Sequence, residues 1–193
     1  MQRAAMVVGF LIGVCLFTPA QAQQYPPWWV WAEAGDGHLK LTSDQHQGDR
    51  SETFALGFAA GRQIRDRARI GLLVDGWLLH AFNLNDPRAG ESISDVMGMF
   101  DLLPVRRVPF FLRGGVGLSM YTNNRPNETG GHGLCWTAGG GYEFPLTRRL
   151  GLVPMVDYSS GGLGDARNVA VVETGRRYSV IEIKAAMVYH FGE

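Results

Sequence analysis

Length and charge limit the classes of function open to this chain. It has 193 residues, with 18 Lys and Arg against 18 Asp and Glu, so its formal net charge at pH 7 is zero. A neutral chain lacks the basic footprint of a nucleic-acid-binding protein, and we expect no nucleic-acid partner. Its two cysteines are too few for a disulfide-stapled scaffold.

The first 22 residues have the pattern of a secretory signal peptide. Arg3 supplies the positive start, residues 6–17 form the apolar run, and AQA at 20–22 matches a small-residue cleavage site. We expect cleavage of residues 1–22, which leaves one domain over 23–193. That domain keeps Cys135 alone, so an intramolecular disulfide is excluded.

Segments of alternating apolar and polar residues recur along the rest of the chain. This period of two predicts β-strands, and no stretch is long and apolar enough for a membrane-spanning helix. We predict eight strands, at 26–35, 52–62, 68–82, 92–103, 109–121, 132–145, 150–160 and 178–191.

Short, arginine-rich connections alternate with longer polar ones. The second, fourth and sixth segments are followed by RQIRDRA, LPVRRV and PLTRRL. The first, third, fifth and seventh are followed by DGHLKLTSDQHQGDRS, NLNDPRAGE, TNNRPNETGG and SGGLGDARNVAVVETGRR. Short turns at one end and long loops at the other are typical of an all-β, eight-stranded antiparallel up-and-down transmembrane barrel. Both chain ends and the short turns would then lie in the periplasm.

The two faces of each segment support a membrane barrel. In the last segment Ile181, Ile183 and Met187 share one face, and Glu182 and Lys184 share the other. A soluble sheet would carry many Lys, Glu, Thr and Ser on its water-facing side. Here the polar faces are mostly small residues with isolated charges, which suits the crowded interior of a narrow barrel.

The chain resembles the small eight-stranded outer-membrane barrels of the OmpA/OmpX type. The resemblance is strongest in the last strand, KAAMVYHF, where Lys184, Tyr189 and Phe191 follow the pattern of a closing strand. Ala186 stands where a glycine is usual, and two residues follow the final aromatic. The resemblance implies a monomer in the bacterial outer membrane. Its partners would be outer-membrane lipid, lipopolysaccharide and the barrel-assembly machinery.

Nine charged side chains are predicted to point into the barrel. They are Glu33, Asp75, Asp95, Asp101, Arg113, Glu143, Asp157, Glu182 and Lys184. Buried ions need partners, so we expect Arg113 to approach Asp101 or Glu143, and Lys184 to approach Asp157 or Glu33. An ion or proton path is the alternative interpretation of the same charges.

No catalytic, cofactor or metal site is predicted. The lipid A deacylases, also eight-stranded barrels, have a His-x-Ser-Asn stretch that VDYSSGGLGDARN resembles in position. Asp157 stands where the histidine is needed, so Ser159 has no local general base. The histidines are predicted in external loops or at an outer strand end, with no metal-binding spacing; they are His38, His46, His80 and His132.

Two further features lead to structural expectations. Aromatic residues are expected in two interfacial belts. The periplasmic belt would contain Trp28, Trp29, Trp31, Tyr142, Phe144, Tyr189 and Phe191, and the outer belt Trp77, Phe82, Tyr121 and Tyr158. Pro154 cannot donate to a β-ladder, so a bulge is expected there.

These observations predict a non-enzymatic outer-membrane barrel with a lumen filled by side chains. Its external loops would serve surface interaction or envelope integrity. Two alternatives remain open at this point: a lipid A-modifying hydrolase that uses Ser159, and a soluble periplasmic barrel that binds an apolar ligand.

Overall fold

The computed structural model describes residues 26–65, 67–79, 91–105, 108–122, 131–167 and 172–192. The expected signal peptide, 1–22, lies outside these ranges, as do His80 and Phe82. Nine antiparallel strands account for most of the described residues. None of the described residues forms a helix that is long and apolar enough to cross a membrane.

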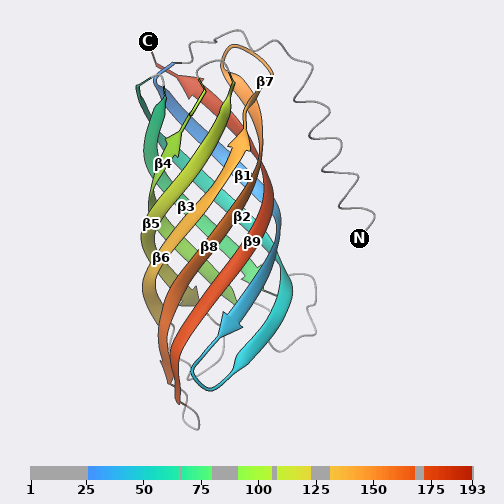
Figure 1. The fold of residues 1–193 in the computed structure, drawn as a ribbon, viewed down its shortest axis with the longest axis vertical. Helices are drawn as coiled ribbons and strands as arrows, with labels where there is room; N and C mark the ends of the chain where they lie inside the picture. Colours follow the sequence, from blue (N-terminus) through green and yellow to red (C-terminus); the bar gives the residue numbers. More distant parts are fainter. Residues whose placement is uncertain are drawn as a thin grey trace.

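The strands close into a barrel (Figure 1). Their bounds are β1 Trp28–Thr42, β2 Gln47–Arg65, β3 Ala68–Leu79, β4 Ser92–Leu102, β5 Phe110–Thr122, β6 Gly131–Tyr142, β7 Phe144–Pro145, β8 Leu150–Arg167 and β9 Val172–Phe191. Neighbours in sequence pair from β1 to β6; β6 then pairs with β8, β8 with β9, and β9 with β1. The two residues of β7 pair with β8. The eight long strands therefore leave no free edge, and the predicted eight-stranded barrel is confirmed.

Side chains alternate between the interior and the exterior along each strand. In β9, Glu182 and Lys184 are buried, whereas Ile181 and Ile183 are 42% and 61% exposed. The exterior is apolar elsewhere too; Leu134, for example, is 78% exposed. A soluble barrel would not leave such a continuous apolar surface in water, so the soluble-barrel alternative is wrong.

Two predicted external loops are largely strand. The segment 36–51 was predicted as a loop, but β1 runs to Thr42 and β2 begins at Gln47. The polar composition of this segment resembles a loop, yet Leu39 still points inward, and the pairing continues through Lys40 and Arg50. In the same way β8 runs to Arg167 and β9 starts at Val172.

Two of the histidines are affected by this correction. His38 lies in β1 and His132 in β6, not in loops, while His46 does lie in the turn between β1 and β2.

The expected bulge at Pro154 is also wrong. The pairing of β8 with β9 runs without a shift from Leu150 to Gly162. On the other side of β8 the ladder is interrupted between β6 and β7, opposite Pro154, and resumes in the same register. The missing N–H of proline accounts for a local interruption of this kind.

Candidate functional site in the barrel interior

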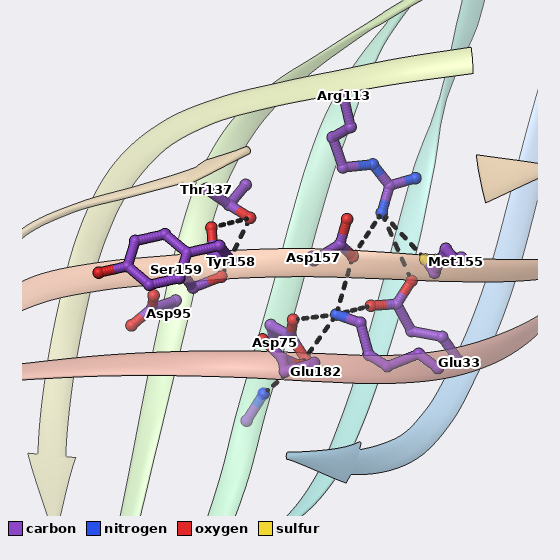
Figure 2. A network of polar contacts seen from close by, with 12 residues as sticks. Glu33, Asp75, Asp95, Arg113, Thr137, Met155, Asp157, Tyr158, Ser159 and Glu182 are labelled. Carbon is purple, nitrogen blue, oxygen red and sulfur yellow. Dashed lines mark hydrogen bonds and ion pairs between the residues drawn. The ribbon is translucent and has the colours of Figure 1, made fainter. Parts of the chain in front are cut away.

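All nine charged residues that were predicted to point inward are buried in the barrel. Each is at most 4% exposed: Glu33, Asp75, Asp95, Asp101, Arg113, Glu143, Asp157, Glu182 and Lys184. Figure 2 shows side chains from several strands converging in this interior, among them Glu33, Asp75, Asp157 and Glu182. They form a central cluster and two smaller groups.

Lys184 occupies the middle of the central cluster. Its Nζ lies 2.6 Å from Asp75 Oδ2, 2.7 Å from Glu33 Oε1, 3.2 Å from Glu182 Oε2 and 3.3 Å from Asp157 Oδ2. Four strands therefore meet at a single ammonium group. The two partners expected from the sequence are present, and two more join them.

A glycine next to Lys184 makes room for this arrangement. Gly35 of β1 pairs with Lys184 of β9. A Cβ at Gly35 would lie 2.7 Å from Lys184 Cα and 2.9 Å from its Cγ. A side chain at this position would therefore displace the lysine from its four carboxylates.

Arg113 forms the second centre of the cluster. Its Nε donates to Asp101 Oδ1 at 3.1 Å, and its Nη1 lies 3.7 Å from both Glu33 Oε2 and Asp157 Oδ2. The guanidinium carbon lies 4.1 Å from the centroid of the Trp31 ring. Planar stacking on an aromatic ring is a contact that arginine makes well and lysine does not.

The central cluster contains more acidic than basic groups. Lys184 and Arg113 are its two cations, and its five carboxylates are those of Glu33, Asp75, Asp101, Asp157 and Glu182. With every group in its usual charged form the balance is two minus five, or −3. The interior is therefore acidic although the whole chain is neutral, and it would repel anions.

Glu143 belongs to a separate group with two residues that were missed from the sequence. Its Oε2 lies 2.9 Å from Arg69 Nη1, and its Oε1 lies 2.8 Å from His190 Nε2. Arg69 and His190 are 3% and 1% exposed. The alternation of inward and outward residues could have identified both, because Arg69 shares the inward face of its strand with Asp75, and His190 shares that of its strand with Lys184.

Asp95 lies in a third group, with aromatic neighbours. The Tyr178 hydroxyl donates to Asp95 Oδ2, and the Tyr178 ring packs against Trp77 with 5.4 Å between centroids. Both rings are buried.

Several aromatic residues expected in the interfacial belts lie in the interior instead. Trp29, Trp31, Trp77 and Tyr121 are all less than 5% exposed. Alternation explains the error: Trp28 faces outward and is 45% exposed, so its neighbour Trp29 must face inward. Trp29 packs on Trp31 with 4.9 Å between centroids, and Trp31 approaches Phe111 at 6.2 Å.

At the external end, the turn between β1 and β2 is joined to β9. Thr174 Oγ1 donates to Asp44 Oδ2 at 3.0 Å and accepts from Gln45 Nε2 at 3.0 Å. The backbone is joined as well, because Asp44 N donates to Thr174 O at 3.1 Å and Thr174 N donates to Gln45 Oε1 at 3.2 Å. We call these three residues the hairpin clamp, since they connect the β1–β2 and β8–β9 hairpins.

Comparison with known proteins identifies the fold. No protein-family model and no curated protein matches the sequence. Among solved structures, Neisserial surface protein A superposes with a TM-score of 0.55 at 18% identity, over 85% of this chain and 97% of that one. The attachment invasion locus protein Ail of Yersinia pestis gives 0.52 at 10% identity, over 85% and 99%. The outer membrane protein AlkL gives 0.50 at 10% identity, over 91% and 97%.

The fold is that of a small outer-membrane β-barrel. The apolar exterior and the charged interior agree with this fold, because lipid contacts the outside of such a barrel and polar groups fill its inside. The chain thus has the fold of the outer-membrane barrels.

Ser159 is poorly placed for a nucleophile. It is fully buried in the interior, and its hydroxyl donates to Thr137 Oγ1 at 3.0 Å (Figure 2). Thr137 in turn donates to the Tyr158 carbonyl at 3.3 Å. The hydroxyl faces away from the lipid where an acyl chain would approach, and it neighbours a threonine rather than the imidazole that acyl transfer requires.

No metal site is apparent in the part of the chain that the structure describes. Within it, no three His, Cys, Asp or Glu side chains are arranged to hold a metal ion.

Proposed function

We propose that this outer-membrane barrel is a non-enzymatic surface protein. Its interior would serve as a closed structural core, and its external end would contact other molecules or support envelope integrity. Outer-membrane lipid and lipopolysaccharide would be its surroundings and partners, and the barrel-assembly machinery would insert it as a monomer.

One observation carries the proposal: buried side chains occupy the barrel interior from Trp29 in the first half of β1 to Leu39 near its end. The acidic cluster around Lys184 and Arg113 lies between two aromatic groups. Trp31 stacks on Arg113 on one side, and the Trp77–Tyr178 pair lies on the other, with Asp95 bonded to Tyr178. Side chains that fill a narrow barrel in this way support a structural role for the charges over an ion or proton path.

The external end is the part of the molecule left for recognition. The β1–β2 and β8–β9 hairpins extend side by side at the end opposite the carboxyl terminus (Figure 1). The hairpin clamp holds them in one arrangement through Thr174, Asp44 and Gln45. A preordered polar surface outside the membrane is suited to binding, because little conformational entropy is lost on contact.

Electrical recording tests the closed core. The full chain, folded in detergent and inserted into planar bilayers, should give no steady current, because side chains that fill the lumen would leave no water-filled path. Heat-modifiable gel mobility of the same sample would verify that it is folded. A steady ion current from the folded chain would contradict the proposal.

Genetic replacement tests the surface role. A strain that lacks the protein should lose adhesion or become more permeable to large antibiotics. The wild-type chain should restore the phenotype, and a chain with residues 43–46 replaced by Asn-Gly should not. Mass spectrometry of lipid A from the same strains provides the counter-test, since a changed acyl pattern would indicate a hydrolase.

A further inference from the structure

We propose that three cations on the outside of the barrel form a binding site for the phosphates of an anionic lipid in the outer leaflet. Lys40 of β1, Arg50 of β2 and Arg177 of β9 make up this external basic patch. The inference rests on the proposed function, because it requires the external end to face the cell surface, and it deepens that function by naming a ligand.

Strand pairing brings the three cations together. Lys40 pairs directly with Arg50 on one side and with Ser179 on the other. Arg177 lies two residues before Ser179 and therefore on the same face, diagonal to Lys40. Direct pairs in a sheet place Cβ atoms about 5 Å apart and diagonal pairs about 7–8 Å apart. Three long basic side chains can thus reach a common phosphate group.

The patch faces outward rather than into the lumen. Leu39 and Val180, the neighbours of Lys40 and Ser179 in sequence, are fully buried in the interior. Arg50 and Arg177 are exposed, and Lys40 is half-buried.

The patch lies where the apolar exterior ends. Two residues from Lys40 along β1, the outward-facing His38 pairs with Glu52 of β2 and Ile181 of β9. Two residues further, Asp36 pairs with Phe54 and Ile183. Ile181 and Ile183 are outward-facing apolar residues of the membrane band. The three cations are therefore at the level of lipid headgroups, where long basic side chains extend their charges toward phosphates.

The positive charge of the patch is not neutralised by the protein. Within the described part of the chain, none of the three cations forms an ion pair. Glu52 is the carboxylate on the same face that lies nearest to Lys40, and Asp49 lies in the adjacent irregular part of β2. Asp36 is also on this face, but it is four residues from Lys40, or about 13 Å along the strand. Around Lys40, three cations therefore face two carboxylates, which leaves an excess of positive charge. An excess at the headgroup level favours a phosphorylated lipid over a neutral one.

The patch is also held rigidly. All three residues are in paired strands, and Thr42 Oγ1 donates to the Arg177 carbonyl at 3.5 Å. The hairpin clamp follows immediately beyond it. A binding site built on strands keeps its geometry when the ligand is absent.

Titration with lipid A tests the proposal. The full chain is folded in mixed micelles of a neutral detergent and bisphosphorylated lipid A, and its thermal unfolding midpoint is measured by gel mobility as the mole fraction of lipid A rises. We expect the midpoint to rise and to saturate. In the variant Lys40→Gln/Arg50→Gln/Arg177→Gln, the half-saturating mole fraction should increase by about fivefold for each cation removed.

A matched variant controls for loss of charge alone. Arg62→Gln/Arg148→Gln/Arg149→Gln removes three exposed cations at the opposite end of the barrel and should titrate like the wild type. Single variants Arg50→Gln and Arg177→Gln, at exposed positions, replace the triple variant if it does not fold.

Three outcomes would overturn the proposal. They are an unchanged titration in the patch variant, an equal midpoint rise with inorganic phosphate, and a larger rise with an acidic polypeptide than with lipid A. None of these bears on the closed core, because bilayer current and lipid A acyl pattern test the proposed function independently.

Discussion

The chain contains two lysines, and the barrel places them in opposite surroundings. Lys40 points outward from β1, whereas Lys184 is buried among four carboxylates. Because one buried ammonium group neutralises several buried carboxylates, Lys184 should contribute more to the stability of the fold than Lys40 does. Without it, four strands would present carboxylates to one another with Arg113 as the nearest counter-charge.

Replacing each lysine should therefore have different consequences. Lys184→Met should reduce the free energy of unfolding by roughly 3–5 kcal/mol, because it leaves buried carboxylates without their partner. Lys40→Met should change it little in neutral detergent, since it removes an outward-facing charge from a half-buried side chain. Urea unfolding of both variants in the same micelles measures the difference, and equal midpoints would show that the central cluster does not stabilise the fold.

Close approach of the backbone gives a second test at the residue scale. Gly139 of β6 pairs with Asp157 of β8, and a Cβ at Gly139 would fall on Asp157 Oδ1 and the Val156 carbonyl. Gly139→Ala should cost about 1–3 kcal/mol through this overpacking. Gly114→Ala is the matched control, because its added Cβ would have no neighbour within 4 Å. Thermal unfolding of the two variants should therefore separate them; a wild-type midpoint for Gly139→Ala would refute the proposed crowding.

At the scale of elements, the hairpin clamp joins two strand pairs that are separated by most of the chain. Thr174 lies 130 residues from Asp44 in sequence, yet its side chain and its backbone both bond to the β1–β2 turn. The clamp lies beyond the membrane band, so its loss should loosen the external end while the barrel stays intact.

Thr174→Val removes the side-chain part of the clamp. We expect amide exchange at Asp44, whose N–H donates to Thr174 O, to become about tenfold faster, as the loss of one or two hydrogen bonds predicts. The thermal midpoint of the barrel should not change. Thr122→Val, at the exposed external end of β5, is the control and should leave exchange at Asp44 as it is. Unaltered exchange in Thr174→Val would mean that the backbone bonds alone hold the turn.

The alternation of apolar and polar residues made the strands, and the direction in which each side chain points, predictable from the sequence. In a closed barrel each inward residue is followed by an outward one. The ends of the strands were less predictable. Segment 36–51 has the polar composition of a loop, but outside the membrane a paired strand also faces water on one side, so composition does not separate the two. Proline gave a similar error: Pro154 interrupts one ladder without adding a residue.

At the scale of the whole molecule, the contacts across the barrel could be anticipated only in part. The sequence placed Lys184 and Asp75 on inward faces, but their contact spans the lumen between β9 and β3. Contacts of this kind depend on the stagger that accumulates around the barrel, which no local pattern records. For the same reason the partners of Glu143, which are Arg69 and His190, were missed although all three face inward.

The inward tryptophans have an optical consequence. Trp28 and Trp136 are 45% and 46% exposed on the lipid side, whereas Trp29, Trp31 and Trp77 are at most 1% exposed. Phospholipids with brominated acyl chains should quench the emission of the first two indoles and leave that of the other three. Trp28→Phe/Trp136→Phe should abolish the quenching, and Trp29→Phe should not alter it. The fluorescence of this barrel thus reports the lipid and the lumen separately, so that insertion into a bilayer and packing of the interior can be timed in one refolding experiment.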